Sequence, residues 1–162
     1  MELNEETPSG KATIALILEV FRLNGRLLAA ADRLVSRFGL TSARWQVLGA
    51  IALAPAPEPV ARLARNMGLT RQGVQRVVNE LIEEGVVALQ ENPHHRRAKL
   101  VLMTEKGKAA FDAAVLRQRP WVNALAADID CHSILAACDT IKTLRIRLEE
   151  QEAETEDNGW PY

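Results

Sequence analysis

A short run of residues near the middle of the chain has the spacing of a helix-turn-helix. Ala64 is small enough for two helices to cross closely, Gly68 follows four residues later, and Val74 follows six residues after that. The turn needs a positive φ, which glycine adopts without steric cost. The apolar third position locks the second helix onto the first. This pattern predicts one helix over about Val60–Asn66 and a second helix capped by Thr70.

A β-hairpin pattern follows the second helix directly. Gly85 ends that helix, and two β-prone runs, residues 86–90 and 99–103, flank a polar loop that contains Asn92-Pro93. A helix, a turn, a second helix and a hairpin, in this order, are the plan of a winged helix-turn-helix domain. The hairpin raises the specificity of the short spacing pattern, which alone can arise by chance.

A long amphipathic helix precedes this core. Apolar residues recur at helical spacing over residues 11–38, and Gly39 is a plausible C-terminal cap. A helix of this length exceeds the needs of one small core, so we expect part of it to pack against a second copy of the chain. We therefore assign residues 1–38 to a leader and a dimerisation helix, and residues 39–107 to the winged helix-turn-helix domain.

A helix and a turn connect the long helix to the helix-turn-helix. Thr41 or Ser42 can cap a helix over about residues 43–54. The segment APAPEP that follows contains three prolines, which exclude the interior of a helix. We expect this segment to form a turn.

Two further helices are expected after the hairpin. One runs from Lys108, with Pro120 kinking or dividing it, and the other covers about residues 132–150. Together, over residues 108–150, they complete the dimerisation domain, and residues 151–162 form an acidic tail that we expect to be disordered. The fold class is therefore mostly α with a small β wing: a winged helix-turn-helix core plus a helical dimerisation domain.

Charge is distributed unevenly along the chain. The formal net charge is -1, with 20 Lys and Arg against 21 Asp and Glu, which gives no overall sign of a nucleic-acid-binding protein. Between residues 60 and 79, however, every charged residue is an arginine, and the hairpin tip adds Arg96, Arg97 and Lys99. The tail after Arg147 is acidic and hides this basic patch in the sum.

Two runs of this region match a known pattern: GLTRQ.V.R.V..L...G.V from Gly68 and RRAKLV.MTEKG from Arg96. They resemble the DNA-binding core of the MarR family of multiple-antibiotic-resistance-type regulators. The flanking helices match the family's dimerisation domain, so the resemblance covers roughly residues 12–150. It implies a homodimer that presents two recognition helices to successive major grooves of a pseudo-palindrome in double-stranded DNA.

The resemblance also implies which residues contact DNA. Thr70 opens the recognition helix, whose N-terminal N–H groups can meet a phosphate. Glutamine can read adenine and arginine can read guanine in the major groove, and arginines at a wing tip can enter the minor groove. The expected contacts are to the DNA backbone from Arg62 and Arg65, to the major groove from Arg71, Gln72, Gln75 and Arg76, and to the minor groove from Arg96 and Arg97. The alternative is that these side chains form a solvated surface.

Two positions need separate explanations. His95 stands where the family usually has an Asp that helps hold the wing arginine, here Arg97, so this arginine is expected to be less rigidly oriented or sensitive to pH. Gly73 lies within the recognition helix, where it costs roughly 1 kcal/mol relative to alanine. It allows close approach to DNA or is drift.

The family also suggests a small-molecule effector. Its members often bind small anionic aromatic compounds between the dimerisation helices and the DNA-binding lobe. This implies a ligand site formed by Phe21, Arg44, Trp45 and Trp121, in which Arg44 would hold a carboxylate and Trp45 a ring. Core packing is the competing role for Phe21 and Trp45.

Signatures of catalysis, cofactors or metals are absent from the sequence. It contains no Gly-rich phosphate loop, GxSxG or HExxH, and His94 and His95 lack companion ligands at zinc spacing. Cys131 and Cys138 are about two helical turns apart, roughly 10 Å, too far for a disulfide within one helix. We expect them in the core, with a bridge between subunits as the alternative. We expect no enzyme, no cofactor and no metal site.

The sequence therefore predicts a cytoplasmic, sequence-specific DNA-binding regulator, because its acidic N-terminus is no signal peptide and no apolar run could cross a membrane. It would repress by occluding a promoter and be released by a ligand. The alternative is a winged-helix dimer that serves as a protein-interaction module without specific DNA binding. The arginines of the recognition helix and the wing argue against that alternative.

Overall fold

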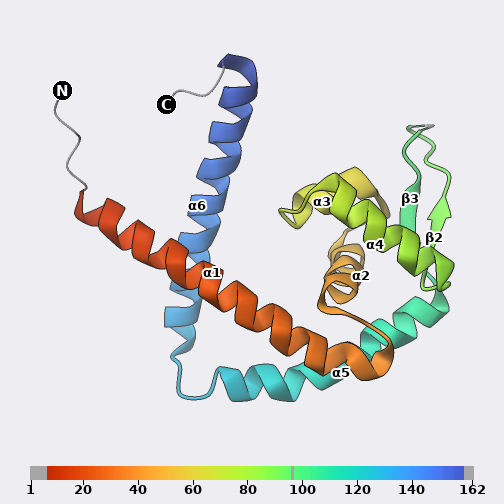
Figure 1. The fold of residues 1–162 in the computed structure, drawn as a ribbon, viewed down its shortest axis with the longest axis horizontal. Helices are drawn as coiled ribbons and strands as arrows, with labels where there is room; N and C mark the ends of the chain where they lie inside the picture. The colour runs from red at the N-terminus through yellow and green to blue at the C-terminus, as the bar shows by residue number, and fades with distance from the viewer. Residues whose placement is uncertain (1–6, 96, 159–162) are drawn as a thin grey trace. The chain divides into compact units, whose positions relative to one another are not determined.

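A computed structural model describes residues 7–95 and 97–158 of the chain, and the side chains of residues 155–158 are not described. The chain forms two compact units, residues 1–119 and residues 120–162 (Figure 1). The first unit contains the helix-turn-helix and the hairpin. The second contains the end of one helix and all of the last helix.

The first unit begins with the long helix α1, Pro8–Val35, and the 3-10 turn η1, Ser36–Phe38. The Thr7 side chain caps α1 by accepting a hydrogen bond from the Gly10 N–H at 3.0 Å, and Pro8 occupies the first turn, where its missing N–H leaves no helical hydrogen bond unmade. The helix therefore starts slightly before the predicted residue 11. The α-helix ends at Val35, before the predicted residue 38, and Gly39, with a φ of 70°, caps η1 instead.

Helix α2, Ser42–Leu53, follows, and Thr41 is its cap, because its hydroxyl accepts from the Arg44 N–H at 3.3 Å. The proline-rich segment after it is not only a turn. Glu58–Pro59 forms a short strand, β1, that pairs antiparallel with the outer part of the hairpin at Val101 and Leu100. Proline lacks an N–H but is tolerated on an edge strand, and β1 lies at the edge of the sheet order β1-β3-β2.

The helix-turn-helix consists of α3, Val60–Asn66, and α4, Arg71–Glu83. Gly68 has the expected positive φ, 63°, and the Leu69 N–H closes the turn by donating to the Ala64 carbonyl at 3.0 Å. The Thr70 hydroxyl caps α4 by accepting from the Gly73 N–H at 3.2 Å. The spacing pattern thus predicted both helices and the turn.

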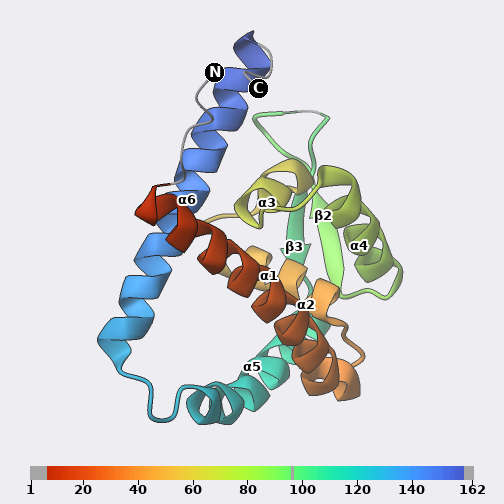
Figure 2. The ribbon, with the colours of Figure 1, turned by 60° about the vertical axis from the view of Figure 1, so that its left-hand side comes forward.

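The hairpin consists of β2, Val87–Gln90, and β3, Leu100–Met103, which pair antiparallel from Val87 opposite Met103 to Gln90 opposite Leu100. Figure 2 shows the two strands side by side next to α4. The predicted two-stranded wing is confirmed, and β1 extends it to a third strand.

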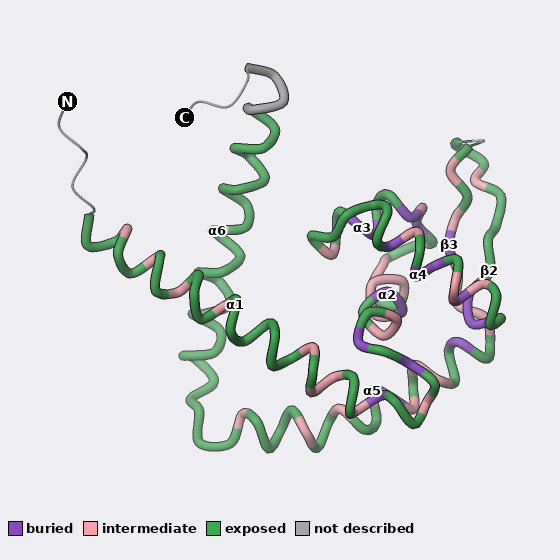
Figure 3. The backbone as a smooth tube through the Cα atoms, viewed as in Figure 1, coloured by how far each residue is buried: buried purple, intermediate pink, exposed green. Residues whose placement is uncertain are grey.

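A core of aliphatic side chains lies between α2, α3, α4 and the sheet. The residues with almost no exposed surface are Leu48, Leu63, Val74, Val78, Leu81 and Val101. Ala64 and Val74, two of the three positions of the helix-turn-helix pattern, are both buried. Figure 3 shows buried stretches, in purple, on α2, α3 and α4. This core fixes α4 to the rest of the lobe and leaves its opposite face to solvent.

Helix α5, Glu105–Leu125, is joined tightly to the end of the hairpin. The Thr104 hydroxyl donates to the Gly85 carbonyl at 2.7 Å and accepts from the Gly107 N–H at 3.1 Å, so α5 begins at Glu105 rather than at the predicted Lys108. A Cβ on Gly107 would lie only 2.0 Å from the Val86 carbonyl oxygen, a distance that only glycine permits. The helix continues through Pro120, and the boundary between the two units falls at this proline.

The second unit is dominated by α6, Cys131–Asn158. Asp130 precedes it and accepts from the Ser133 N–H at 2.9 Å. The helix extends past the expected end near residue 150, so residues 151–158 are helical where we expected a disordered tail. The reason is that glutamate, glutamine and alanine favour helix, and no glycine or proline interrupts this stretch.

The long helices leave many apolar side chains exposed in this single chain. In the first unit, α1 exposes Ile14, Ile17, Leu18, Phe21 and Leu23, and in the second unit α6 exposes Ile134, Leu135, Ile141 and Leu148. Cys131 and Cys138 are likewise exposed on α6, not buried as expected, since α6 buries none of the residues whose side chains are described. Among the described residues, no helix is long and apolar enough to cross a membrane.

Candidate DNA-binding face

Helix α4 separates its apolar and polar side chains onto opposite faces. Val74, Val77, Val78 and Leu81 are buried against the lobe, as expected. Arg71, Gln72 and Arg76 are exposed, and Gln75 is half-buried at the edge of the exposed face. The four predicted readers are therefore on the side of α4 that a major groove could receive.

A groove of about 250 Å³ runs between α4, the start of α3 and the wing. It brings together residues that the sequence suggested separately, because Arg71 and Gln75 come from α4 and Arg97 from the wing. Its lining consists of Pro59, Val60, Ala61, Arg71, Gln75, Leu89, Arg97, Ala98 and Lys99. Helix and wing therefore present basic side chains to one shared depression.

Two of the predicted readers are held by partners on their own helix. The Gln75 side-chain amide donates to the Asn79 carbonyl oxygen at 2.9 Å, and the Arg76 guanidinium pairs with the Glu80 carboxylate at 2.9 Å. Our sequence analysis did not single out Asn79 or Glu80. The signal was available, since residues four apart are neighbours on a helix surface.

The start of α4 explains Gly73. A Cβ at this position would lie 3.0 Å from the Thr70 hydroxyl oxygen, the atom that caps the helix. This contact is tight, so a larger residue would shift the cap by a few tenths of an ångström, and the glycine also leaves the helix start open. The sequence alone had suggested only close approach to DNA or drift as explanations for Gly73.

The two arginines of α3 differ in how they are held. The Arg62 Nε atom lies 3.1 Å from Glu58, a largely buried carboxylate on β1 that also accepts from the Asn66 amide at 2.8 Å. Arg65 is exposed and forms no ion pair among the residues that the structure describes. Glu58 is a further residue that the sequence analysis missed, because its position beside Arg62 depends on β1.

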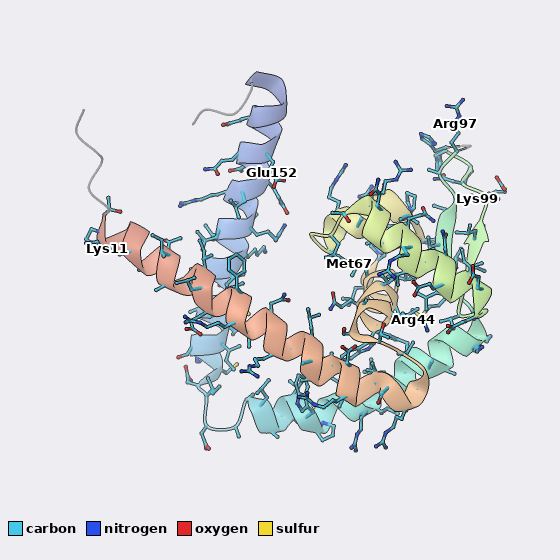
Figure 4. All side chains as sticks on the ribbon, viewed as in Figure 1. Lys11, Arg44, Met67, Arg97, Lys99 and Glu152 are labelled. Atoms are coloured by element: carbon cyan, nitrogen blue, oxygen red, sulfur yellow. The ribbon has the colours of Figure 1, made fainter. Side chains whose placement is uncertain are left out.

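The wing places Arg97 and Lys99 near its tip (Figure 4). Arg97 is exposed and makes no ion pair within the described part of the chain, whereas Lys99 lies 3.6 Å from Glu91 across the hairpin. Arg96, the other predicted wing contact, lies outside the described residues. His95 is exposed, and its backbone N–H donates to the Asn92 carbonyl at 3.2 Å.

Arg44, the expected carboxylate receptor of the ligand site, is already engaged by carboxylates of the protein. It forms a two-pronged pair with Glu84, with N···O distances of 3.0 and 2.8 Å, and its guanidinium also lies 3.4 Å from Glu80. Trp45 is half-buried and packs against the core, whereas the Phe21 ring is 68% exposed. Trp121 belongs to the second unit. The ligand site remains a prediction.

A metal centre finds no support in the described residues, where no group of three or more His, Cys, Asp and Glu side chains could hold an ion. His94 and His95 are both exposed on the wing.

Comparison with known proteins identifies relatives of this chain in sequence and in fold. Residues 38–98 match the model of the MarR family. An uncharacterized protein of Mycobacterium tuberculosis is 36% identical over 134 residues, which cover 83% of this chain and 92% of that protein.

Solved structures share the fold. CouR from Rhodococcus jostii RHA1, in a crystal structure bound to p-coumaroyl-CoA, has a TM-score of 0.70 at 26% identity, covering 77% of this chain and 87% of that one. The M. tuberculosis transcriptional regulator MosR, in complex with DNA, has a TM-score of 0.68 at 22% identity, covering 82% and 96%. Family model, relative and fold agree, and the chain belongs to the MarR family of transcriptional regulators.

Proposed function

We propose that this chain is a sequence-specific DNA-binding repressor that occupies a pseudo-palindromic operator as a homodimer. The observation that carries the proposal is the shared groove, into which α4 contributes Arg71 and Gln75 and the wing contributes Arg97 and Lys99. A recognition helix in the major groove and a wing beside it would use these side chains for base and backbone contacts.

The exposed apolar residues of α1 and α6 support the homodimer. Side chains such as Leu18 and Phe21 on α1, and Leu135 and Leu148 on α6, lie open to solvent in the single chain. Exposed apolar side chains along a helix are unfavourable in water and commonly mark a protein–protein interface. A second copy that covers these helices would also set the spacing between the two recognition helices.

An effector that releases the DNA is the second part of the proposal. CouR, which shares 26% identity with this chain, binds p-coumaroyl-CoA, an anionic compound with an aromatic ring. In this chain, we propose that Phe21, Arg44, Trp45 and Trp121 contribute to an effector site. An anionic effector would have to compete with Glu80 and Glu84 for Arg44.

The test is selection of bound duplexes from fragmented genomic DNA, followed by fluorescence anisotropy over a series of salt concentrations. The proposal expects an inverted repeat that binds far more tightly than random DNA, with affinity that falls steeply as salt rises. Weak binding without sequence preference would contradict a specific operator. An absence of binding at low salt would favour the protein-interaction module.

A further inference from the structure

Glu80 lies between two arginines that come from different helices. One of its carboxylate oxygens, Oε1, pairs with Arg76 on α4 at 2.9 Å, and the other, Oε2, pairs with Arg44 on α2 at 3.4 Å. Arg44 also pairs with Glu84, the C-cap residue of α4, at 2.8 Å. An ion-pair chain therefore crosses from the exposed face of the recognition helix to the helix behind it.

Exposure falls steadily along this chain. The Arg76 side chain is 73% exposed, that of Glu80 34% and that of Arg44 18%. Arg76 is thus free to move toward a ligand on the outer face, whereas Arg44 is held by two carboxylates and by the Gly39 carbonyl at 3.4 Å. Arg44 is placed to influence the outer face through Glu80 and not by direct contact.

The two ion pairs of Glu80 have different roles when DNA binds. A phosphate or a base edge that takes Arg76 removes one cation from Glu80. If Arg44 stays, the carboxylate keeps a partner. If Arg44 is missing, an unpaired carboxylate is left on the helix that faces the phosphates, where charge repulsion opposes binding.

We propose that Arg44 is a positioning residue for DNA binding: by neutralising Glu80 from behind, it frees Arg76 to leave that carboxylate for the DNA. The inference rests on the proposed function and adds to it a residue that does not itself touch DNA. Glu80 then keeps its ion pair with Arg44 after its ion pair with Arg76 on α4 has been broken.

The test is a set of variants whose affinity is measured by fluorescence anisotropy on one labelled duplex recovered from the genomic selection. Arg44→Gln should weaken binding about three- to tenfold at low salt. Adding Glu80→Gln to that variant should restore affinity to within about twofold of the wild-type chain, because the uncompensated carboxylate is gone.

Two controls separate this mechanism from simpler ones. Glu83→Gln removes the same charge from the same helix, and Glu83 forms no ion pair among the described residues, so it should not rescue Arg44→Gln. Glu80→Gln alone should bind the duplex at least as tightly as the wild-type chain, because no carboxylate then competes with the DNA for Arg76. Rescue by Glu83→Gln equal to that by Glu80→Gln would overturn the inference, as would weaker binding by Glu80→Gln alone.

A merely structural tie between α2 and α4 makes a different prediction. In that case, adding Glu80→Gln to Arg44→Gln weakens DNA binding further. The loss of affinity then follows the decrease in the urea midpoint of unfolding. Should Arg44→Gln fail to fold, Arg44→Lys keeps the cation while losing the two-pronged pair. It should bind within about twofold of wild type. A loss of binding by a folded Arg44→Lys chain would overturn the inference.

DNA binding by the wild-type chain distinguishes a failure of the proposed function from a failure of the inference alone. A wild-type chain that binds no duplex overturns the proposed function and the inference with it. A wild-type chain that binds the duplex, without rescue in the double variant, overturns the inference alone.

Discussion

Helices α4 and α6 are supported in opposite ways. In α4, Val74, Val77, Val78 and Leu81 are buried against neighbouring elements. In α6, no residue with a described side chain is buried, and Leu135 and Leu148 are among its exposed apolar residues. A helix that packs within its own lobe is stabilised by the chain itself, whereas a helix with an uncovered apolar face needs another surface.

The same comparison holds within the first unit. The helix-turn-helix lobe has a closed aliphatic core, while most of α1 lies outside it, and Val35, at its end, is the only buried residue of that helix with a described side chain. The lobe should therefore keep its fold when the contacts of the long helices are removed. Substitutions in the lobe and in the long helices can test this difference in how the two regions are stabilised.

The largest effect is expected at the joint between the hairpin and α5. In Gly107→Ala, the new Cβ would lie 2.0 Å from the Val86 carbonyl oxygen, a backbone atom beside the core that cannot move freely. We expect a loss of about 3 kcal/mol or more in the free energy of unfolding. Urea denaturation followed by circular dichroism measures it.

Gly25→Ala is the matched control. Gly25 lies within α1, and an added Cβ there would meet nothing within 4 Å. This variant should be stabilised by up to about 1 kcal/mol, since alanine favours helix more than glycine does. Equal stability of the two variants would contradict the tight joint.

The second prediction concerns the uncovered helices. Phe21→Glu should raise the dissociation constant of the dimer by about 30-fold or more, because the aromatic ring would meet a partner in the dimer and a carboxylate could not replace it. Analytical ultracentrifugation measures the change. The isolated lobe gains nothing from Phe21, so the core should still unfold cooperatively.

Leu53→Glu provides the comparison for Phe21→Glu. Leu53 is 87% exposed at the end of α2, within the lobe and outside the long helices. It should leave the dimer intact. A dimer that is insensitive to Phe21→Glu would place the interface elsewhere.

The lobe was predicted more completely than its ion pairs. Helices α3 and α4, the turn at Gly68 and the hairpin follow from local spacing, which the residues themselves determine. Strand β1 was missed because a two-residue strand exists only through its pairing with β3. Glu58, the partner of Arg62, was missed for a related reason, because it lies on β1. The pair of Glu80 with Arg44 likewise depends on the position of α2, whereas its pair with Arg76, four residues away on the same helix, could have been predicted.

The long helices illustrate the opposite failure. Their periodicity predicted an apolar stripe but not what covers it, so Cys131 and Cys138 were assigned to a core that the single chain does not form. The end of α6 was placed too early, because acidity was given more weight than helix propensity. The ligand site stays a prediction. The proximity of its residues depends on tertiary structure, and Arg44 is engaged by Glu84.

The third prediction concerns the wing. Arg97→Ala should weaken DNA binding across sequences and reduce the slope of log affinity against log salt by about one, because one cation–phosphate contact is lost. Anisotropy titrations over a salt series measure the slope. Arg37→Ala, which removes a cation from η1 outside the groove, should leave the slope unchanged. An unaltered slope for Arg97→Ala would remove the wing from the DNA-binding face.

The smallest effect is expected where α1 meets α2. The Ser42 N–H donates to the Asp32 carboxylate at 2.6 Å, and this hydrogen bond, together with one from the Ser42 side chain, holds the pKa of Asp32 below its ordinary value of about 3.8. A carboxyl group with a lowered pKa in the folded chain stabilises the fold above its unfolded pKa. That stability is lost as the pH falls through the folded pKa.

Asp32→Asn should therefore flatten the acid side of the stability profile. The wild-type chain should lose stability relative to Asp32→Asn as the pH falls from about 5 to about 3, and the two profiles should run parallel near neutral pH. Asp112→Asn, at an exposed position on α5 without an ion pair among the described residues, is the control. If both variants shift the acid side of the stability profile equally, the hydrogen bond between Asp32 and Ser42 makes no specific contribution to the stability of the junction between α1 and α2.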